Sequence, residues 1–202
     1  MTDNDLSQYA LLLVDVQKDF WPEKLSALYP DFPENVSNLL ALCRENGIDI
    51  IHLRASFKED MSDWMPRYKI RKRIPCVEGT EGSEVLPFAN ALPGEKVFNK
   101  QTFDGFHNPS LLSYLQDQKK KCLMVAGLVT STCVLFTASS ATQLGFLSAV
   151  ISDCCADEPT IHNTILDRYQ FIFDQTKYKE ILEMVPKWNE TMGELGMLDT
   201  AS

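Results

Sequence analysis

The chain has 202 residues, 45% hydrophobic and 23% charged, a composition that suits a soluble domain, and we expect residues 1–202 to form one domain. The net charge of −9 argues against nucleic acid as a partner, because contacts with phosphates need a positive surface. No apolar run approaches the roughly 18 residues of a membrane span, so we expect no membrane partner either.

The first half of the chain alternates between strand and helix patterns. A continuous apolar run at 10–16 predicts a strand that is covered on both faces. Helical periodicity follows over 35–46 and stops at Gly47, which favours a helix end. The branched and apolar residues at 48–56 and 95–100 predict the next two strands.

The segment 57–94, between these two strands, is long and irregular. It holds several prolines and glycines, and loops of this length in compact domains are often functional. Its basic stretch at 67–74 is flanked by acidic residues, so we interpret it as a solvated loop or an anion-facing patch. We expect this segment to shape a pocket, although it contains no recognisable code for a substrate.

The second half repeats the alternation. The expected elements are a helix at 108–121, a strand at 122–129, a helix at 131–144, a strand at 146–153, a helix near 160–169, a short strand at 170–174, and then 177–185 with a charged tail. Repeated βα units imply a mainly parallel sheet between two helical layers. A six-stranded order 3-2-1-4-5-6 would bring the ends of the first and fourth strands together, where such sheets bind ligands.

Cys133 lies where the helix after the fourth strand should begin. Unpaired backbone N–H groups and the helix dipole favour negative charge there, which would stabilise a thiolate or an oxyanion. The small residues before it, Thr130 to Thr132, let the backbone come close to a ligand. The alternative is that Cys133 is a small buried hydrophobe, as most free cysteines are. The residues alone leave both interpretations open.

Two more candidate residues stand at strand ends. Asp15 closes the first strand and could cap a turn or take the proton of a thiol. Asp19 could anchor the adjoining loop through backbone N–H groups. Lys100 could be solvated, or it could lower the pKa of a neighbouring thiol and stabilise the thiolate. Because it lies about two strand spacings of ~4.8 Å from the first strand, a bent loop would have to carry it across.

Three blocks, "LLLVDVQKDF", "VFNKQTFDGF" and "VAGLVTSTCV", resemble the signature blocks of the isochorismatase-like cysteine hydrolases, and the resemblance covers nearly the whole chain. This family includes isochorismatases, nicotinamidases and N-carbamoylsarcosine amidases. The resemblance implies a three-layer α/β/α fold, a catalytic triad of Asp15, Lys100 and Cys133, and assembly as a homo-oligomer. It also implies a cis peptide bond before Val129, so that the N–H groups of Val129 and Cys133 form an oxyanion hole.

The sequence departs from the nicotinamidase branch, which carries an aspartate and histidines after the second strand to hold a metal. The three histidines, His52, His107 and His162, are scattered, and no C-x-x-C spacing occurs. We therefore expect neither a metal nor another cofactor. Six cysteines without a recognisable secretion signal predict reduced thiols in a cytoplasmic protein.

Together these features predict a metal-independent cysteine hydrolase that cleaves a small amide or carbamoyl substrate through a thioester. We expect Phe20, Trp21, Trp64 and Phe103 in the pocket wall, although aromatic residues are often plain core. One alternative is hydrolysis of a vinyl ether such as isochorismate, with Asp15 as the acid. Another is a non-catalytic binding protein on the same fold. A dinucleotide-binding protein is disfavoured, because no glycine follows the first strand closely.

Overall fold

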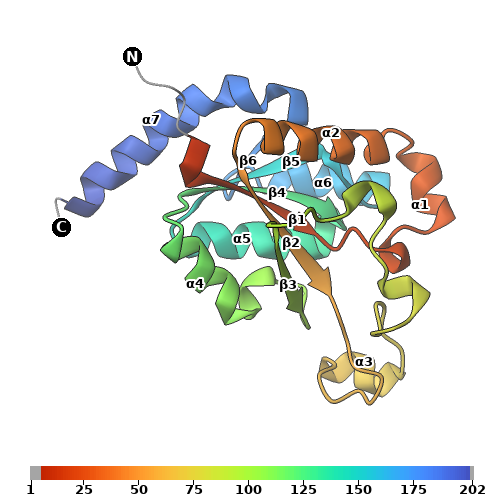
Figure 1. Cartoon of the computed structure of the whole chain (residues 1–202). Coiled ribbons are helices and arrows are strands. Elements are labelled where there is room, and N and C mark those ends of the chain that lie inside the picture. The colour runs from red at the N-terminus through yellow and green to blue at the C-terminus, as the bar shows by residue number, and fades with distance from the viewer. Residues whose placement is uncertain (1–5, 201–202) are drawn as a thin grey trace.

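The computed structural model describes residues 6–200, and within them the chain forms one sheet of six parallel strands (Figure 1). The strands are β1 (Tyr9–Val14), β2 (Asp49–Ala55), β3 (Lys96–Lys100), β4 (Cys122–Leu128), β5 (Leu147–Ala156) and β6 (Asp174–Thr176). Their order is β3-β2-β1-β4-β5-β6, and every neighbouring pair is parallel. The predicted fold class and strand order are confirmed.

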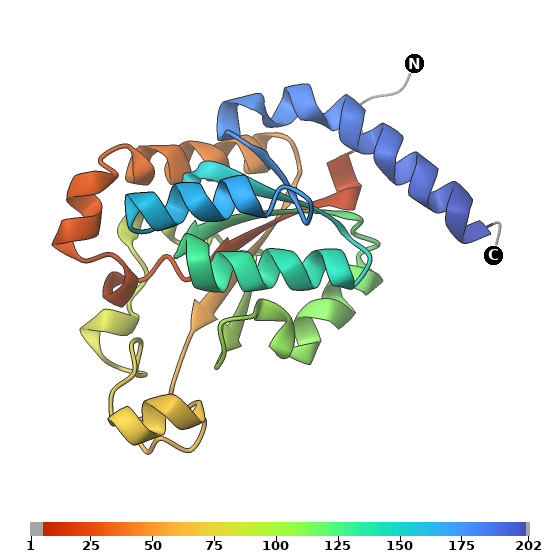
Figure 2. The same cartoon turned by 180° about the vertical axis from the view of Figure 1, so that it is seen from behind.

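Helices cover both faces of the sheet (Figures 1 and 2). Those described are α1 (Glu23–Leu28), α2 (Phe32–Glu45), α3 (Pro66–Arg71), α4 (Pro109–Asp117), α5 (Leu135–Gln143), α6 (Pro159–Arg168) and α7 (Ile181–Thr200). In both views α2 and α7 lie toward one side of the sheet, and α4 and α5 toward the other. Within residues 6–200, no helix combines the length and the apolar character that crossing a membrane requires.

The central strands are buried on both faces, which explains their continuous apolar sequences. All residues of β1 and β4 are buried, whereas β3 at the sheet edge is exposed over most of its length. Lys100 is the buried exception in β3. A lysine that is buried at the end of an otherwise exposed strand needs an acceptor or a negative charge close by.

The C-terminal third corrects two sequence predictions. Residues 170–173 form a turn rather than a strand, with Phe171 exposed and Phe173 directed into the core, and β6 begins only at Asp174. The segment described as a charged tail belongs to α7, which the sequence analysis missed. One face of that helix is buried at helical spacing, through Ile181, Val185, Trp188 and Met192.

The irregular segment 57–94 follows the carboxyl end of β2, and its helix α3 projects away from the sheet (Figure 1). Four of its residues, Phe57, Trp64, Ile74 and Cys76, form a small apolar cluster with Ala55 at the end of β2. The Asp19 carboxylate accepts a hydrogen bond of 2.7 Å from the backbone N–H of Cys76. Asp19 therefore anchors this segment through a backbone N–H group, the kind of contact that the sequence analysis proposed for the adjoining loop.

Gly127 lies where the backbone of β4 packs directly against the backbone of β1. Its φ angle is +123°, and a Cβ atom at this position would collide with the carbonyl oxygen of Val14. The pairing of β4 with β5 also shifts register between Val125 and Gly127. A residue without a side chain is therefore needed at this position, so that the turn after β4 can lie beside the end of β1.

We predict that Gly127→Ala lowers the free energy of unfolding by at least ~2 kcal/mol, because the new methyl group meets backbone that cannot move aside. Urea denaturation followed by circular dichroism measures the change. Gly193→Ala is the matched control, because nothing lies within 4 Å of a Cβ at that helical position. The control should raise stability by roughly 0.5–1 kcal/mol. Equal effects of the two substitutions would contradict the collision argument.

Candidate active site

The carboxyl ends of β1, β3 and β4 bring three of the predicted site residues together. Asp15 directly follows β1, Lys100 ends β3, and Cys133 lies in the π-helical turn Thr130–Val134 between β4 and α5. Lys100 Nζ lies 2.6 Å from Asp15 Oδ2 and 3.5 Å from Cys133 Sγ. The lysine side chain itself reaches past β2, so the bent loop expected from the sequence is not needed to carry the ammonium across.

The ion pair is fully supplied with hydrogen-bond partners. Lys100 Nζ donates to Asp15, to Cys133 and, over 2.9 Å, to the carbonyl oxygen of Thr102. These contacts use all three donors of an ammonium group. The second Asp15 oxygen accepts a 2.8 Å hydrogen bond from the backbone N–H of Ala55. Asp15 has a φ of +50°, a left-handed conformation that aspartate tolerates better than most residues.

The electrostatics of the site leave the thiol protonated at rest. Burial raises the pKa of Cys133, the nearby Asp15 carboxylate raises it further, and Lys100 opposes both only in part. Burial also raises the pKa of Asp15, against the opposing effect of Lys100. Burial lowers the pKa of Lys100, but Asp15 and Cys133 together outweigh it and keep the ammonium charged. The expectation of a lowered thiol pKa is therefore wrong.

A cavity of about 200 Å³ opens onto Asp15, Lys100 and Cys133. Apart from these residues and two threonines, its wall consists of apolar or aromatic side chains from the loop after β1, the end of β2, the segment 57–76 and the loop after β3. The wall residues are Phe20, Ala55, Phe57, Met65, Tyr68, Ile74, Pro75, Thr102, Phe103 and Thr132. The three polar groups therefore meet a largely apolar space.

Two of the four aromatic residues expected in the wall line this cavity, namely Phe20 and Phe103. Trp21 instead stacks on Phe32 of α2, with 4.5 Å between ring centroids. Trp64 packs within the small apolar cluster described above and donates its indole N–H to the carbonyl of Lys58. The sequence analysis missed Met65, Tyr68, Ile74 and Pro75, because the irregular 57–94 segment gives no periodicity from which a facing side could be read.

The turn that carries Cys133 is fixed by several contacts. The peptide bond between Leu128 and Val129 is cis, as the resemblance implied. The carbonyl of Val129 accepts hydrogen bonds from the N–H groups of Thr132 and Val134. Val129 lines a neighbouring hollow and is not among the residues that line the cavity at the triad. Asp157 contributes from the end of β5, where its carboxylate accepts a 2.9 Å hydrogen bond from the N–H of Ser131.

The arrangement of donors does not fit a metal centre. Among the described residues, no three His, Cys, Asp or Glu side chains are grouped closely enough to hold a metal ion. His52 is buried, and its Nε2 lies 2.8 Å from Glu95 Oε2, so the ring is packed within the fold. His162 contacts Thr130, and His107 belongs to a short turn after β3. We therefore derive no reaction step through a metal.

We predict that Lys100→Met lowers the free energy of unfolding by about 3–5 kcal/mol near neutral pH, because the buried Asp15 carboxylate loses its partner. Adding Asp15→Asn to that variant should recover most of the loss, since no unpaired charge then remains. Denaturant titration of the wild type, both single variants and the double variant measures the coupling. Additive losses in the double variant would refute the pairing argument.

We also predict that Cys133 alkylates before the other five cysteines in the folded protein. Its side chain lines a cavity and keeps 4% exposure, whereas the others retain 0–1%. Asp15 can accept the thiol proton as the sulfur attacks, so Asp15→Asn should slow the labelling of Cys133 alone. Brief iodoacetamide treatment with peptide mass mapping is the measurement. Cys155, which borders another cavity, is the internal control, and its labelling as fast as Cys133 would contradict the prediction.

Comparisons with known proteins agree with the fold. The chain matches the isochorismatase domain over residues 9–179. It is 27% identical to maleamate amidohydrolase of Pseudomonas putida over 158 residues, which covers 73% of this chain and 72% of that protein. It is 26% identical to nicotinamidase of Escherichia coli over 212 residues, with 91% and 98% covered.

The fold has close counterparts among solved structures. The isochorismatase family protein from Desulfovibrio vulgaris superposes with a TM-score of 0.81 at 22% identity, over 89% of this chain and 98% of that one. At this identity the likeness supports the fold alone. The domain match, in contrast, spans most of the sequence and includes all three strand ends that meet at the site. The chain therefore belongs to the isochorismatase family of hydrolases.

Proposed function

We propose that the protein is a cysteine amidohydrolase that cleaves the amide or carbamoyl group of a small, largely apolar substrate. The observation that carries the proposal is the contact of Asp15, Lys100 and Cys133 at one end of an apolar cavity. Two of the relatives, maleamate amidohydrolase and nicotinamidase, are named for amide hydrolysis, which supports this reaction class.

The first half of the reaction forms a thioester. Cys133 Sγ attacks the carbonyl carbon while Asp15 takes the thiol proton. Lys100, 3.5 Å from Sγ, stabilises the negative charge as it develops on sulfur. We assign the backbone N–H groups of Val129 and Cys133 to the oxyanion. The C–N bond then breaks, Asp15 returns its proton to the nitrogen, and ammonia or an amine leaves while the acyl group stays on sulfur.

The second half releases the acid. Asp15 takes a proton from water, and the resulting hydroxide attacks the thioester carbonyl. The C–S bond breaks, the thiolate regains a proton through Asp15, and the carboxylic acid leaves. Throughout both halves, one proton moves between the Asp15 carboxylate, the Cys133 thiol and the substrate or water, while the Lys100 ammonium keeps its charge. Because the pair is buried and neutral overall, no uncompensated charge has to form in the apolar cavity.

The cavity wall restricts the substrate. A volume of about 200 Å³ exceeds the roughly 150 Å³ that holds benzene in an apolar cavity, so a ring or a branched chain with its carbonyl fits. Isochorismate carries two carboxylates, and Lys100, the cation in this wall, is already paired with Asp15. A vinyl ether dicarboxylate would therefore lack partners for its charges. This favours neutral amides over the alternative reaction.

We predict that a screen of primary amides, ureas and isochorismate yields ammonia from at least one neutral amide with a ring or branched chain. Cys133→Ala should then lose at least ~10³-fold in kcat while still binding substrate, and Cys133→Ser should be nearly as inactive. Asp15→Asn should lose the base and fall similarly. Because the triad acts as a unit, a double variant should be little worse than the worst single one.

The control for this series is Cys122→Ala, which removes a buried thiol at the start of β4 and should keep kcat close to that of the wild type. Turnover by Cys133→Ala near the wild-type rate would overturn the nucleophilic mechanism. Pyruvate release from isochorismate by that variant would instead establish acid chemistry by Asp15.

A further inference from the structure

The mechanism leaves the cations of the segment 67–73 without a role. This stretch carries five of them, all with exposed side chains, namely Arg67, Lys69, Arg71, Lys72 and Arg73. From the sequence, the stretch could be a solvated loop or a patch that faces an anion. The structure favours the second interpretation for two of the five, because Arg71 and Arg73 line a hollow in the protein surface, whereas the other three are not part of its wall.

This hollow lies beside the catalytic cavity and has a volume of about 340 Å³. Besides the two arginines, Asp19, Tyr68, Ile74 and Pro75 form its wall. Tyr68, Ile74 and Pro75 also line the cavity at the triad, so the two spaces are neighbours. Tyr68 and Pro75 are partly exposed, which places the shared boundary at the protein surface. A molecule too long for the cavity would therefore extend over this boundary into the hollow.

Two guanidinium groups give the hollow an excess of positive charge. Within residues 6–200, neither Arg71 nor Arg73 forms a hydrogen bond or an ion pair through its side chain. Asp19 is the carboxylate in this wall, and it already accepts a hydrogen bond from the N–H of Cys76. The remaining excess of one positive charge suits a monoanion such as a carboxylate. A guanidinium also presents paired N–H donors that match the two oxygens of a carboxylate.

The fold fixes where these charges lie relative to the cavity. Arg73 directly precedes Ile74, and Ile74 and Cys76 are both buried in the small apolar cluster that includes Ala55 at the end of β2. The hydrogen bond from Cys76 to Asp19 ties the same stretch to the loop after β1. Arg71 ends α3 only two residues earlier. The backbone that carries both arginines is therefore anchored next to the strand ends of the site.

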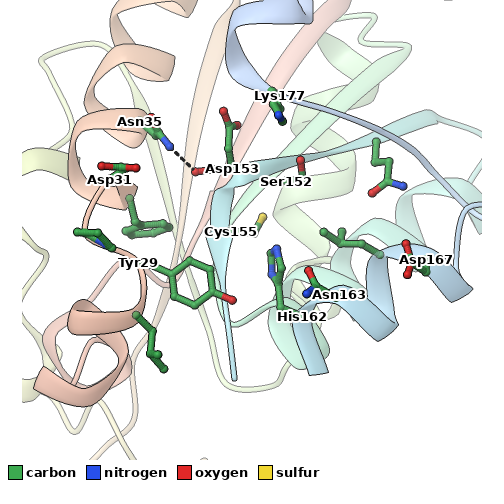
Figure 3. Close-up of a pocket in the computed structure, with 15 residues that line it drawn as sticks. Tyr29, Asp31, Asn35, Ser152, Asp153, Cys155, His162, Asn163, Asp167 and Lys177 are labelled. Carbon is green, nitrogen blue, oxygen red and sulfur yellow. Dashed lines mark hydrogen bonds between the residues drawn. The ribbon is translucent and has the colours of Figure 1, made fainter. Parts of the chain in front are cut away.

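A larger cavity, of about 590 Å³, lies among the α1–α2 junction, β5 and α6, and it lacks both features (Figure 3). It shares no lining residue with the catalytic cavity. Figure 3 shows Asn35 directed at Asp153, to whose carbonyl it donates a 2.9 Å hydrogen bond. The Asp153 carboxylate accepts another from the N–H of Tyr178. Polar groups of that cavity are thus engaged within the fold, and a ligand there would not reach the triad.

We propose that the hollow binds a carboxylate at the far end of the substrate, with Arg71 and Arg73 as its partners, while the amide lies at Cys133. The substrate class is then an amide or carbamoyl compound with an apolar middle and a remote acid. The acid must be remote, because the cation in the cavity, Lys100, is already paired with Asp15. Neutral amides that fill the cavity alone still react, without the second contact. The substrate class rests on the proposed function, whereas the anion site does not.

The anion site is tested without a substrate, by labelling Cys133 with two reagents of similar shape. 4-(Iodoacetamido)benzoate carries a carboxylate opposite its reactive carbon, and N-phenyliodoacetamide is its neutral counterpart. Peptide mass mapping gives the ratio of the two labelling rates, anionic over neutral, and N-acetylcysteine gives the same ratio for a free thiol. We expect the ratio at Cys133 to exceed that of the free thiol by roughly threefold or more. Equal ratios overturn the proposal.

Three single substitutions locate the source of the preference. Arg71→Met and Arg73→Met should each lower the ratio by roughly twofold or more, as expected for exposed charge pairs. Arg67→Met is the matched control, because it removes the same charge from α3 at a position that does not line the hollow, and its ratio should stay close to that of the wild type. A similar loss in all three would indicate a long-range field instead of a binding site and would refute the proposal, as would unchanged ratios in both hollow variants.

The substrate class is tested with matched amides, phenylacetamide and its para-carboxylate. The acid should have the higher kcat/KM by roughly threefold or more. Arg71→Met should remove this advantage through KM with kcat nearly unchanged, because a remote contact stabilises the ground state and the transition state alike. Hydrolysis without an advantage for the acid overturns the substrate class and leaves the proposed function standing. Failure of every amide in the screen, with the labelling preference intact, counts against the proposed function and leaves the anion site standing.

Discussion

A buried ion pair between Asp15 and Lys100 is the constraint on which the site depends. Both side chains are almost completely removed from solvent, and their charged atoms are 2.6 Å apart. Such a pair is stable only where hydrogen bonds satisfy the remaining donors and acceptors. The N–H of Ala55 and the carbonyl of Thr102 do this here. The ends of three neighbouring strands and one loop must therefore be in register before Cys133 has its two partners.

The low polarity of the site makes the ion pair costly to bury, and it also determines the protonation state of the Cys133 thiol. An apolar wall raises the pKa of Cys133, so the sulfur is not held as a ready anion. In return, the interaction of Lys100 with a developing thiolate is stronger than it would be in water. The geometry suits a reaction in which the proton moves to Asp15 as the sulfur attacks. The segment 57–76 contributes much of the apolar wall of the cavity and so accounts for much of its low polarity.

The parts of the fold that sequence could predict are those in which burial dictates composition. β1 and β4 are buried on both faces and have unbroken apolar sequences, and the repeated βα units then imply a parallel sheet. The strand placed at 170–174 failed because its aromatic residues serve a turn, where one is exposed and another fills the core. The helix α7 was missed because Pro186 and two glycines interrupt its pattern. The triad positions followed from the family resemblance, whereas the wall formed by 57–76 depends on tertiary packing that no local pattern encodes.

The central position of β1 has a consequence for the biogenesis of the protein. Its partners on the two sides are β2 and β4, and β4 begins only at Cys122. During synthesis, the apolar strand β1 therefore keeps one edge unpaired until well over half of the chain has left the ribosome. Unpaired apolar edges of this kind promote aggregation and attract chaperones. A nascent chain that stalls before β4 would expose this edge, so expression yield should respond to translation speed upstream of β4 more than to changes near the C-terminus.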